Sequence, residues 1–308
     1  MTIVRIRLLW HKQAQFAGYL LAEKLRLGAK YGVEIVCEGL DPNCRHVESV
    51  LTGASQMAVA SPAHILESAD PAALLWLLTF QQESPLVYPV RKKMGIEKPA
   101  DLAGRKVGVW PGHEDLELRW LLQAAGLEPD AAERMPMPDT VGPFLRGEID
   151  CAQMTNYHEL HHVEETLGAS EISVFSARDF GCSILKDGLA VSSRFADANG
   201  DIVQAVVNSV LEGWKIAFLE PDRAIAACVE ARLDVSEAEH RRQLADIRSL
   251  SLTGASLSRG LGYPDQVHVQ QAARAIAEVE NKAVDASSVL EDSFWWAAPE
   301  ELRPRIAQ

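Results

Sequence analysis

The chain has 308 residues, of which 47% are apolar, and its 30 basic and 43 acidic residues give a formal net charge of −13. This length and apolar fraction predict a globular protein with a large core. Because the basic residues form no run, the charge disfavours nucleic acid and anionic membrane surfaces as partners and favours small ligands.

The first predicted element is a strand that leads directly into a helix. Residues 3–9 are mostly β-branched or long apolar, and from Phe16 onward the apolar residues keep helical spacing. The carboxyl end of this strand carries Trp10, His11, Lys12 and Gln15. Open α/β sheets bind ligands at this position, over the N-terminus of the following helix.

Strands and helices then alternate, which is typical of mostly parallel sheets flanked by helices. The predicted strands are residues 33–37, a short strand ending at Ser61-Pro62, and residues 74–80. The predicted helices are residues 45–51 and a segment containing His64–Ser68.

A second unit is predicted to begin after residues 81–85. Its elements are an extended segment at 86–90, a strand at 106–110, a helix at 114–125 and a helix, glycine and strand over 144–154. Residues 188–193 are the predicted returning strand, followed by helices at 201–219, 221–231, 236–249 and 264–284. We expect lobe 1 at 1–86 and 188–308, lobe 2 at 87–187, and two hinge crossings over a cleft.

Neither a membrane span nor a secretory leader is expected. The most apolar segment, 72–80, is much shorter than the roughly 20 residues of a spanning helix. The first strand begins without a preceding basic and apolar segment, so either a leader was trimmed or the protein is cytosolic. The cysteines at 37, 44, 151, 182 and 228 predict free thiols, with a Cys37–Cys44 bridge as the alternative.

Several segments together resemble a known family. They are Leu9-Trp10 with Gln15–Gly18, Ser61-Pro62, residues 96–109 (IEKPADLAGRKVGV), residues 259–265 (RGLGYPD) and Phe294-Trp-Trp296. In these segments the chain resembles type II periplasmic binding proteins of ABC importers. Within them it is most similar to the branch that binds the thiamine pyrimidine precursor, whose relatives bind alkanesulfonates, nitrate or riboflavin.

The resemblance implies a ligand held between the lobes by aromatic faces and a few polar groups. The implied ligand-binding residues are Trp10, His11, Gln15, Ser61 and His64 in the first lobe and Trp110, Gly112, His113, Glu114, Asn156, Tyr157 and Glu159 in the second. The ring of Trp110 would stack on a flat ligand, and Glu159 would accept hydrogen bonds from an aminopyrimidine edge.

Each of these residues also has a purely structural interpretation. Trp10 and Trp110 are alternatively core aromatics, since tryptophan is mostly buried in any fold. Ser61 alternatively caps the helix that follows it. His113 and Glu114 also suit a helix start.

A competing motif is His158-Glu159-Leu-His-His162, which matches the HExxH signature of zinc proteases. The metzincin continuation requires Gly at position 165 and His at position 168, where this chain has Glu165 and Gly168. We therefore assign no catalytic metal. His158 and His162 stay as candidates for an adventitious one, and a zinc metallohydrolase is a minor alternative function.

His64 lies where the fungal thiamine-pyrimidine synthases of this fold carry a histidine that serves as a substrate. The lysine expected four residues earlier, which would hold pyridoxal phosphate, is Ala60 here. The cysteine-rich iron-binding run expected near Cys182 is reduced to that one cysteine. Both departures disfavour the synthase reaction.

The sequence thus predicts a two-lobe solute-binding protein that closes on a small planar heterocycle resembling the thiamine pyrimidine. We expect no cofactor and no catalysis, an ABC transporter permease as partner, no nucleic acid, no membrane insertion, and a monomer or weak dimer. The location would be periplasmic if a leader was trimmed and cytoplasmic otherwise. The alternative is a leaderless cytosolic enzyme on the same fold, similar to the pyrimidine synthases or to a desulfinase.

Overall fold

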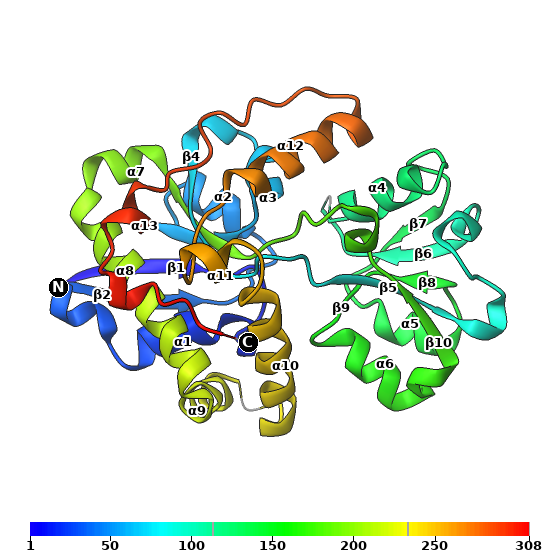
Figure 1. Ribbon diagram of the computed structural model, residues 1–308, viewed down its shortest axis with the longest axis horizontal. Coiled ribbons are helices and arrows are strands. Elements are labelled where there is room, and N and C mark those ends of the chain that lie inside the picture. Colours follow the sequence, from blue (N-terminus) through cyan, green and yellow to red (C-terminus); the bar gives the residue numbers. More distant parts are fainter. Residues whose placement is uncertain (113, 233, 308) are drawn as a thin grey trace. The chain divides into compact units, whose positions relative to one another are not determined.

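The computed structural model describes residues 1–112, 114–232 and 234–307, and its contacts divide the chain into two compact units (Figure 1). Unit 1 comprises Met1–Glu83, Lys186–Gln270 and Asp285–Gln308, and unit 2 comprises Ser84–Leu185 and Gln271–Val284. The lobe boundaries expected from the sequence stay a prediction. The units differ from them chiefly because 271–284 groups with unit 2.

Unit 1 contains a five-stranded sheet in the order β2-β1-β3-β11-β4. Its strands are β1 (Thr2–Arg7), β2 (Val33–Glu38), β3 (Met57–Ala60), β4 (Leu74–Thr79) and β11 (Gly188–Ser192). β1 runs parallel to β2 and β3, whereas the returning strand β11 is antiparallel to β3 and β4. Gly188 pairs with both Ala60 and Thr79, so β11 begins at the edge where β3 and β4 end.

Helices surround this sheet, and one of them extends into the other unit. The helices of unit 1 are α1 (Ala17–Lys24), α2 (His46–Leu51), α3 (Pro62–Leu66), α7 (Ser193–Ala198), α8 (Gly200–Leu219), α9 (Pro221–Ala231), α10 (Glu237–Ser251), α11 (Ala255–Arg259) and α13 (Ser293–Ala297). Helix α12 (Gln266–Glu280) begins in unit 1 and ends in unit 2.

Helix α8 is long and apolar enough to cross a membrane by length and composition. This differs from the expectation that 72–80 is the most apolar segment; in α8, the polar residues Gln204, Glu212 and Lys215 lie among the apolar ones. In the structure, 67% of the apolar window of α8 is buried inside the protein. The central helix of a globular domain passes the same test, so this helix is weak evidence for a membrane span.

The contact between α1 and α8 depends on two glycines. A Cβ atom at Gly213 would lie 2.0 Å from the carbonyl oxygen of Gly18, and one at Gly18 would lie 2.2 Å from the ring of Trp214. The Trp214 ring stacks on Phe80 at a centroid distance of 5.0 Å. Small residues therefore let the two backbones approach, and the tryptophan fixes α8 against the end of β4.

Unit 2 contains a mixed sheet in the order β10-β5-β8-β6-β7, with β9 paired to β5. Its strands are β5 (Leu86–Arg91), β6 (Lys106–Val109), β7 (Glu133–Pro136), β8 (Cys151–Ala152), β9 (Met154–Thr155) and β10 (Ile172–Phe175). β6 is parallel to β7 and β8, whereas β5 is antiparallel to β8, β9 and β10. The predicted α/β fold with flanking helices is confirmed, but the sheets are mixed and not mostly parallel as expected, because β5 and β11 run antiparallel to their neighbours. Strands β7 and β10 were not anticipated.

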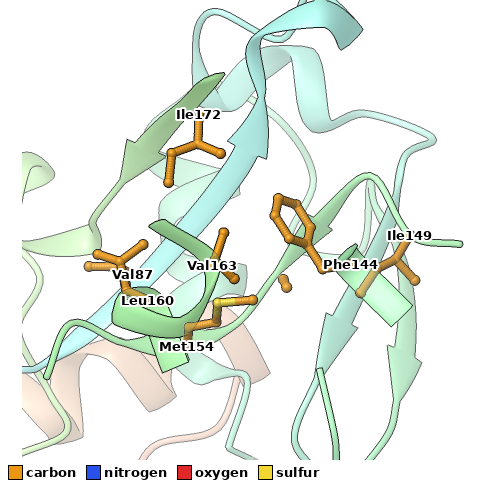
Figure 2. Packing of buried hydrophobic residues seen from close by; sticks show 8 residues of the cluster. Val87, Phe144, Ile149, Met154, Leu160, Val163 and Ile172 are labelled. Atoms are coloured by element: carbon orange, nitrogen blue, oxygen red, sulfur yellow. The ribbon is translucent and has the colours of Figure 1, made fainter. Parts of the chain in front are cut away.

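The helices of unit 2 are α4 (Leu116–Ala124), α5 (Val141–Arg146) and α6 (Glu159–Leu167). Figure 2 shows an apolar core that α5 and α6 form with the sheet. Phe144 of α5 and Val163 of α6 are fully buried there beside Val87 of β5 and Met154 of β9. This core fixes the segment between β9 and α6, where several predicted site residues lie.

The glycine contact gives a first prediction. Gly213→Ala should lower the free energy of unfolding by about 1–3 kcal/mol, because the new methyl group forces α1 and α8 apart. Gly200→Ala in the same helix has open space around its Cβ and should stay within about 0.5 kcal/mol of the original protein or gain slightly. Urea unfolding measures both. Equal stabilities of the two variants would contradict the close contact.

A second prediction concerns pH and the buried His268, whose ring meets Trp76 edge-on at 6.0 Å. Burial, with a smaller effect of the Lys186 ammonium, lowers its pKa from 6.5 to about 3. The folded-state pKa lies below the unfolded value, so this stabilisation is complete above pH 6.5 and is lost as the pH falls toward 3. Wild type should therefore lose about 2 kcal/mol more than His268→Gln between pH 6.5 and pH 5. The prediction is wrong if the urea midpoints of the two proteins change by the same amount between pH 6.5 and pH 5.

Candidate functional site

Buried polar side chains gather at one edge of the unit 1 sheet. This edge is where β3 and β4 end and β11 begins, and the segment after β1 joins it through hydrogen bonds. The residues are Gln13, Gln15, Ser61, His64, Gln81, Gln82, Lys186 and Asp187, and all of them are buried. We call this set the polar edge of unit 1. Such a concentration of buried polar groups is unusual away from a functional site.

Asp187 connects the segments of the polar edge. Its carboxylate oxygen Oδ2 accepts hydrogen bonds from Nε2 of Gln15 at 2.7 Å and from Nε2 of Gln81 at 3.1 Å. Its backbone oxygen accepts from the N–H groups of Phe80 and Gln81 at 2.8 and 3.1 Å. The next residue is Gly188, where a Cβ atom would lie 2.0 Å from the carbonyl oxygen of Leu78. The Asp187 carboxylate is thus held directly before β11, where the backbone is closely packed.

Further amide groups extend from this carboxylate. Gln13 donates from Nε2 to Oε1 of Gln15 at 3.0 Å, and the backbone N–H of Gln15 donates to Oε1 of Gln243 at 3.2 Å. Gln82 donates from Nε2 to the carbonyl oxygens of Thr79 and Tyr263, each at 3.1 Å. The Lys186 ammonium donates to the carbonyl oxygen of Gln82. Gln13, Gln15, Gln81 and Asp187 are thus joined by side-chain hydrogen bonds, and Gln82 and Lys186 adjoin them in the chain.

Ser61 and His64 form a reciprocal cap on α3. Oγ of Ser61 accepts from the His64 N–H at 3.3 Å, and Nδ1 of His64 accepts from the Ser61 N–H at 3.1 Å. The capping interpretation of Ser61 thus describes its contact in the structure. The ring of His64 meets that of His46 edge-on at 4.6 Å, and burial lowers the pKa of His46 well below its usual value. His46 is therefore a neutral imidazole.

Trp10 and His11 follow β1 outside the core. Trp10 is half-buried, His11 is exposed, and their rings meet edge-on at 5.3 Å. The backbone oxygen of Trp10 accepts from the Leu40 N–H at 3.0 Å, which fixes the turn. Partial burial, followed by the positive charge of Arg232, lowers the pKa of His11.

In unit 2, Trp110 follows the end of β6 and is half-buried. Its backbone N–H donates to Oε1 of Gln153 at 3.4 Å, and Nε2 of Gln153 donates to the carbonyl oxygen of Glu114 at 2.7 Å. The buried amide of Gln153 thus holds the turn on which Trp110 and Gly112 lie. His113, also predicted for the site, lies outside the described residues.

A pocket of about 250 Å³ lies beside this turn within unit 2. It is lined by Val109, Trp110, Pro111, Gly112, Asp115, Arg119, Arg134, Pro136 and Glu280. Both arginines are already paired: Arg119 with Glu280 and Asp130, and Arg134 with Asp115 and Asp130. The pocket wall is therefore an ion-pair network, and it offers no uncompensated positive charge to an anion.

Asn156, Tyr157 and Glu159 lie between β9 and α6. The Asn156 N–H donates to the carbonyl oxygen of Pro85 at 2.9 Å, and Tyr157 is buried. Oε2 of Glu159 accepts from the Thr155 N–H at 3.0 Å and from the Thr155 hydroxyl. One oxygen of Glu159 is thus engaged locally, and its predicted contact with a ligand stays a prediction.

The HExxH motif falls at the start of α6. His158 precedes the helix with φ −138° and ψ −79°, and its ring meets that of His162 edge-on at 5.5 Å. Glu159, which would be the general base, holds Thr155 instead. Among the described residues, no group of three or more His, Cys, Asp or Glu side chains could hold a metal ion.

None of the five cysteines forms a disulfide, as predicted, so the structure contains no Cys37–Cys44 bridge. Burial raises the pKa of Cys37 and of Cys151 far above the usual thiol value, and it raises the pKa of Cys228 to about 12. A thiol attacks as its thiolate, so these three are poor nucleophiles at neutral pH.

Sequence reasoning found Gln15, Ser61 and His64 of the polar edge but missed its other members. The missed residues are Gln13, Gln81, Gln82, Lys186 and Asp187. A signal was available, because Gln81-Gln82 directly follows one apolar strand and Lys186-Asp187 directly precedes another. The structure brings both pairs to one sheet edge because β11 is antiparallel to β4.

Comparison with known proteins agrees with this fold. The chain is similar to the periplasmic aliphatic sulphonate-binding protein SsuA from Escherichia coli, with 17% identity, a TM-score of 0.70, and coverage of 95% of this chain and 92% of that one. It is similar to the alkanesulfonate-binding protein SsuA from Xanthomonas axonopodis pv. citri bound to MOPS, with 16% identity, a TM-score of 0.66, and coverage of 95% and 99%. It is also similar to the desulfurization enzyme DSZB, solved as a mutant with biphenyl-2-sulfinic acid, with 13% identity, a TM-score of 0.65, and coverage of 95% and 97%.

At these low identities, the structural similarity shows a shared fold and no more. No curated protein matches the chain in sequence. The family model described as "NMT1/THI5 like" matches residues 13–224, which is more than half of the chain. The protein therefore belongs to the NMT1/THI5-like family.

Proposed function

We propose that the protein is a solute-binding protein that captures a small planar heterocycle for an ABC importer. The observation that carries the proposal is the polar edge of unit 1. There, amide oxygens of Gln13, Gln81 and Gln82 are buried and have no hydrogen-bond partner among the described residues. Native proteins rarely leave buried polar atoms unpaired, and this edge is the usual ligand position of an open α/β sheet.

Trp110 supports a planar ligand. Its ring is half-buried, its backbone is held by Gln153, and it adjoins the 250 Å³ pocket of unit 2. A partly exposed indole on a fixed turn suits stacking on a flat ring. The resemblance of the sequence to the branch that binds the thiamine pyrimidine precursor supports an aminopyrimidine as the class of ligand.

The proposed partner and location come from the relatives. The SsuA proteins of similar fold are described as periplasmic or alkanesulfonate-binding proteins, and one further similar structure is the ligand-binding component of an ABC-type import system from Staphylococcus aureus. By analogy with these proteins, we propose that this protein acts in the periplasm and delivers its ligand to a permease.

The second candidate function is an enzyme on the same fold, favoured by the similarity to DSZB. The contacts at the candidate catalytic groups count against it. His64 accepts the cap hydrogen bond of α3 at Nδ1, and burial keeps the thiols of Cys37, Cys151 and Cys228 protonated. A binding protein needs neither group to be reactive.

Thermal unfolding with candidate ligands tests the proposed function. A ligand that binds the folded protein must raise the melting temperature, so an aminopyrimidine should raise it by several degrees at saturating concentration. Riboflavin, ethanesulfonate and nitrate complete the panel. The binding function is wrong if none of them shifts the transition while pyridoxal phosphate with iron(II) does.

Two tryptophan variants sharpen this test. Trp110→Ala should abolish the ligand-induced shift, because it removes the proposed stacking surface. Trp120→Ala is the matched control, since Trp120 lies on α4 and donates to Glu278 at 3.2 Å. Trp120→Ala should keep the ligand-induced rise in melting temperature, even if its melting temperature without ligand differs from that of wild type. Equal shifts in the two variants would remove Trp110 from the proposed site.

Thiol titration tests the enzyme alternative. Cys44 is half-buried and the other cysteines are buried, so only Cys44 should react quickly with Ellman's reagent in the native protein. The others should react after denaturation in guanidinium, and Cys44→Ser should remove the fast phase. A fast phase that persists in Cys44→Ser would reveal an activated thiol and favour the enzyme.

A further inference from the structure

Among the residues that the structure describes, the unpaired amide atoms of the polar edge are all oxygens; beside them, the buried hydroxyl of Thr79 at the end of β4 is also unpaired. Gln13, Gln81 and Gln82 are each no more than 3% exposed, and in each the side-chain oxygen Oε1 has no hydrogen-bond partner within the described part of the chain. In each, the amide nitrogen is already bonded. The three glutamines therefore present hydrogen-bond acceptors to a ligand, while their amide N–H groups are engaged within the protein.

The direction of these amides follows from the acceptors around them. The Asp187 carboxylate can only accept, so Gln15 and Gln81 must turn their N–H groups toward it. Gln15 then presents its oxygen to Gln13, which in turn must donate and leave its own oxygen unpaired. Two backbone carbonyl oxygens, those of Thr79 and Tyr263, fix Gln82 in the same way.

Reversing any of these amides would place a carbonyl oxygen against a carboxylate or another carbonyl oxygen. That contact is repulsive and would also leave an amide N–H group unpaired. The orientation of these amides is therefore fixed by the fold: the Asp187 carboxylate orients Gln81 directly and Gln13 through Gln15, and two backbone carbonyl oxygens orient Gln82.

The positive charge at this edge does not change its character. The Lys186 ammonium donates to the backbone oxygen of Gln82 and is buried. It is adjacent in sequence to Asp187, so the pair contributes no net charge. An incoming oxyanion would meet the Asp187 carboxylate and the glutamine oxygens, and both repel it.

We infer that the polar edge of unit 1 selects a ligand that donates hydrogen bonds from N–H groups and rejects oxyanions such as sulfonates and nitrate. The inference rests on the proposed solute-binding function and specifies its ligand chemistry. It separates this chain from the sulfonate-binding proteins of the same fold. Gln13 and Gln81 are the specificity-determining residues, and Asp187 positions them.

Isothermal titration of the full-length protein tests this selection. The probes are 4-aminopyrimidine, its 4-dimethylamino analogue, which has lost the exocyclic N–H groups, and ethanesulfonate. The amine should bind at least about tenfold more tightly than the dimethylamine, since one lost hydrogen bond leaves a buried acceptor unpaired. Ethanesulfonate should give no binding heat.

Three variants locate the effect. Gln13→Met and Gln81→Met remove one acceptor each and should weaken binding of 4-aminopyrimidine about tenfold. Gln204→Met is the matched control, because this glutamine of α8 bonds Asn208 and the Phe294 carbonyl oxygen away from the polar edge. It should leave the affinity unchanged. Circular dichroism checks that each variant is folded. If a variant fails to fold, the affinities of wild type for the three probes test the inference without it.

The outcomes separate this inference from the proposed function. If wild type binds none of the probes, riboflavin or nitrate, the solute-binding function fails and the inference falls with it. If it binds ethanesulfonate or nitrate more tightly than 4-aminopyrimidine, the binding function stands and the inference is overturned. Equal affinities of Gln13→Met, Gln81→Met and Gln204→Met for 4-aminopyrimidine would also overturn it.

Discussion

The buried carboxylate of Asp187 is the constraint on which the candidate site depends. A buried charge is tolerated only when its hydrogen bonds are satisfied, and Asp187 achieves this by collecting groups from distant parts of the chain. Gln15 is 172 residues away from it and Gln81 is 106 residues away. Satisfying one carboxylate thus joins the segment after β1, the end of β4 and the start of β11 at a single sheet edge.

Unit 2 uses the same principle at the ends of its own segments. Glu117 of α4 is 2% exposed, and its carboxylate accepts from the Ser84 hydroxyl at 2.9 Å and from the N–H groups of Ile184 and Leu185 at 2.6 and 2.7 Å. Ser84 is the first residue of unit 2 and Leu185 the last before the chain returns to unit 1. In each unit, therefore, a buried acid holds together the chain segments that enter and leave it.

Local patterns predicted the fold better than the site. The alternation of strands and helices, the glycine-terminated helices and the returning strand at 188–193 are local features, and the structure confirms the α/β fold. Trp10 and Gln15 could be placed at a strand end for the same reason. The amide network could not be foreseen, because its hydrogen bonds depend on an antiparallel β11 that periodicity does not reveal. Glu159 likewise has a contact with Thr155 that only the conformation between β9 and α6 explains.

The packing around Gly188 limits how this site could change during evolution. No side chain fits at position 188, because the Leu78 carbonyl oxygen and the Trp76 indole occupy the space. The backbone that carries Asp187 is therefore fixed, whereas Gln13 and Gln81 are single side chains that mutation could exchange without moving a strand. A lineage built on this fold could acquire a new ligand through those amides, one residue at a time, while its carboxylate and sheet stayed the same.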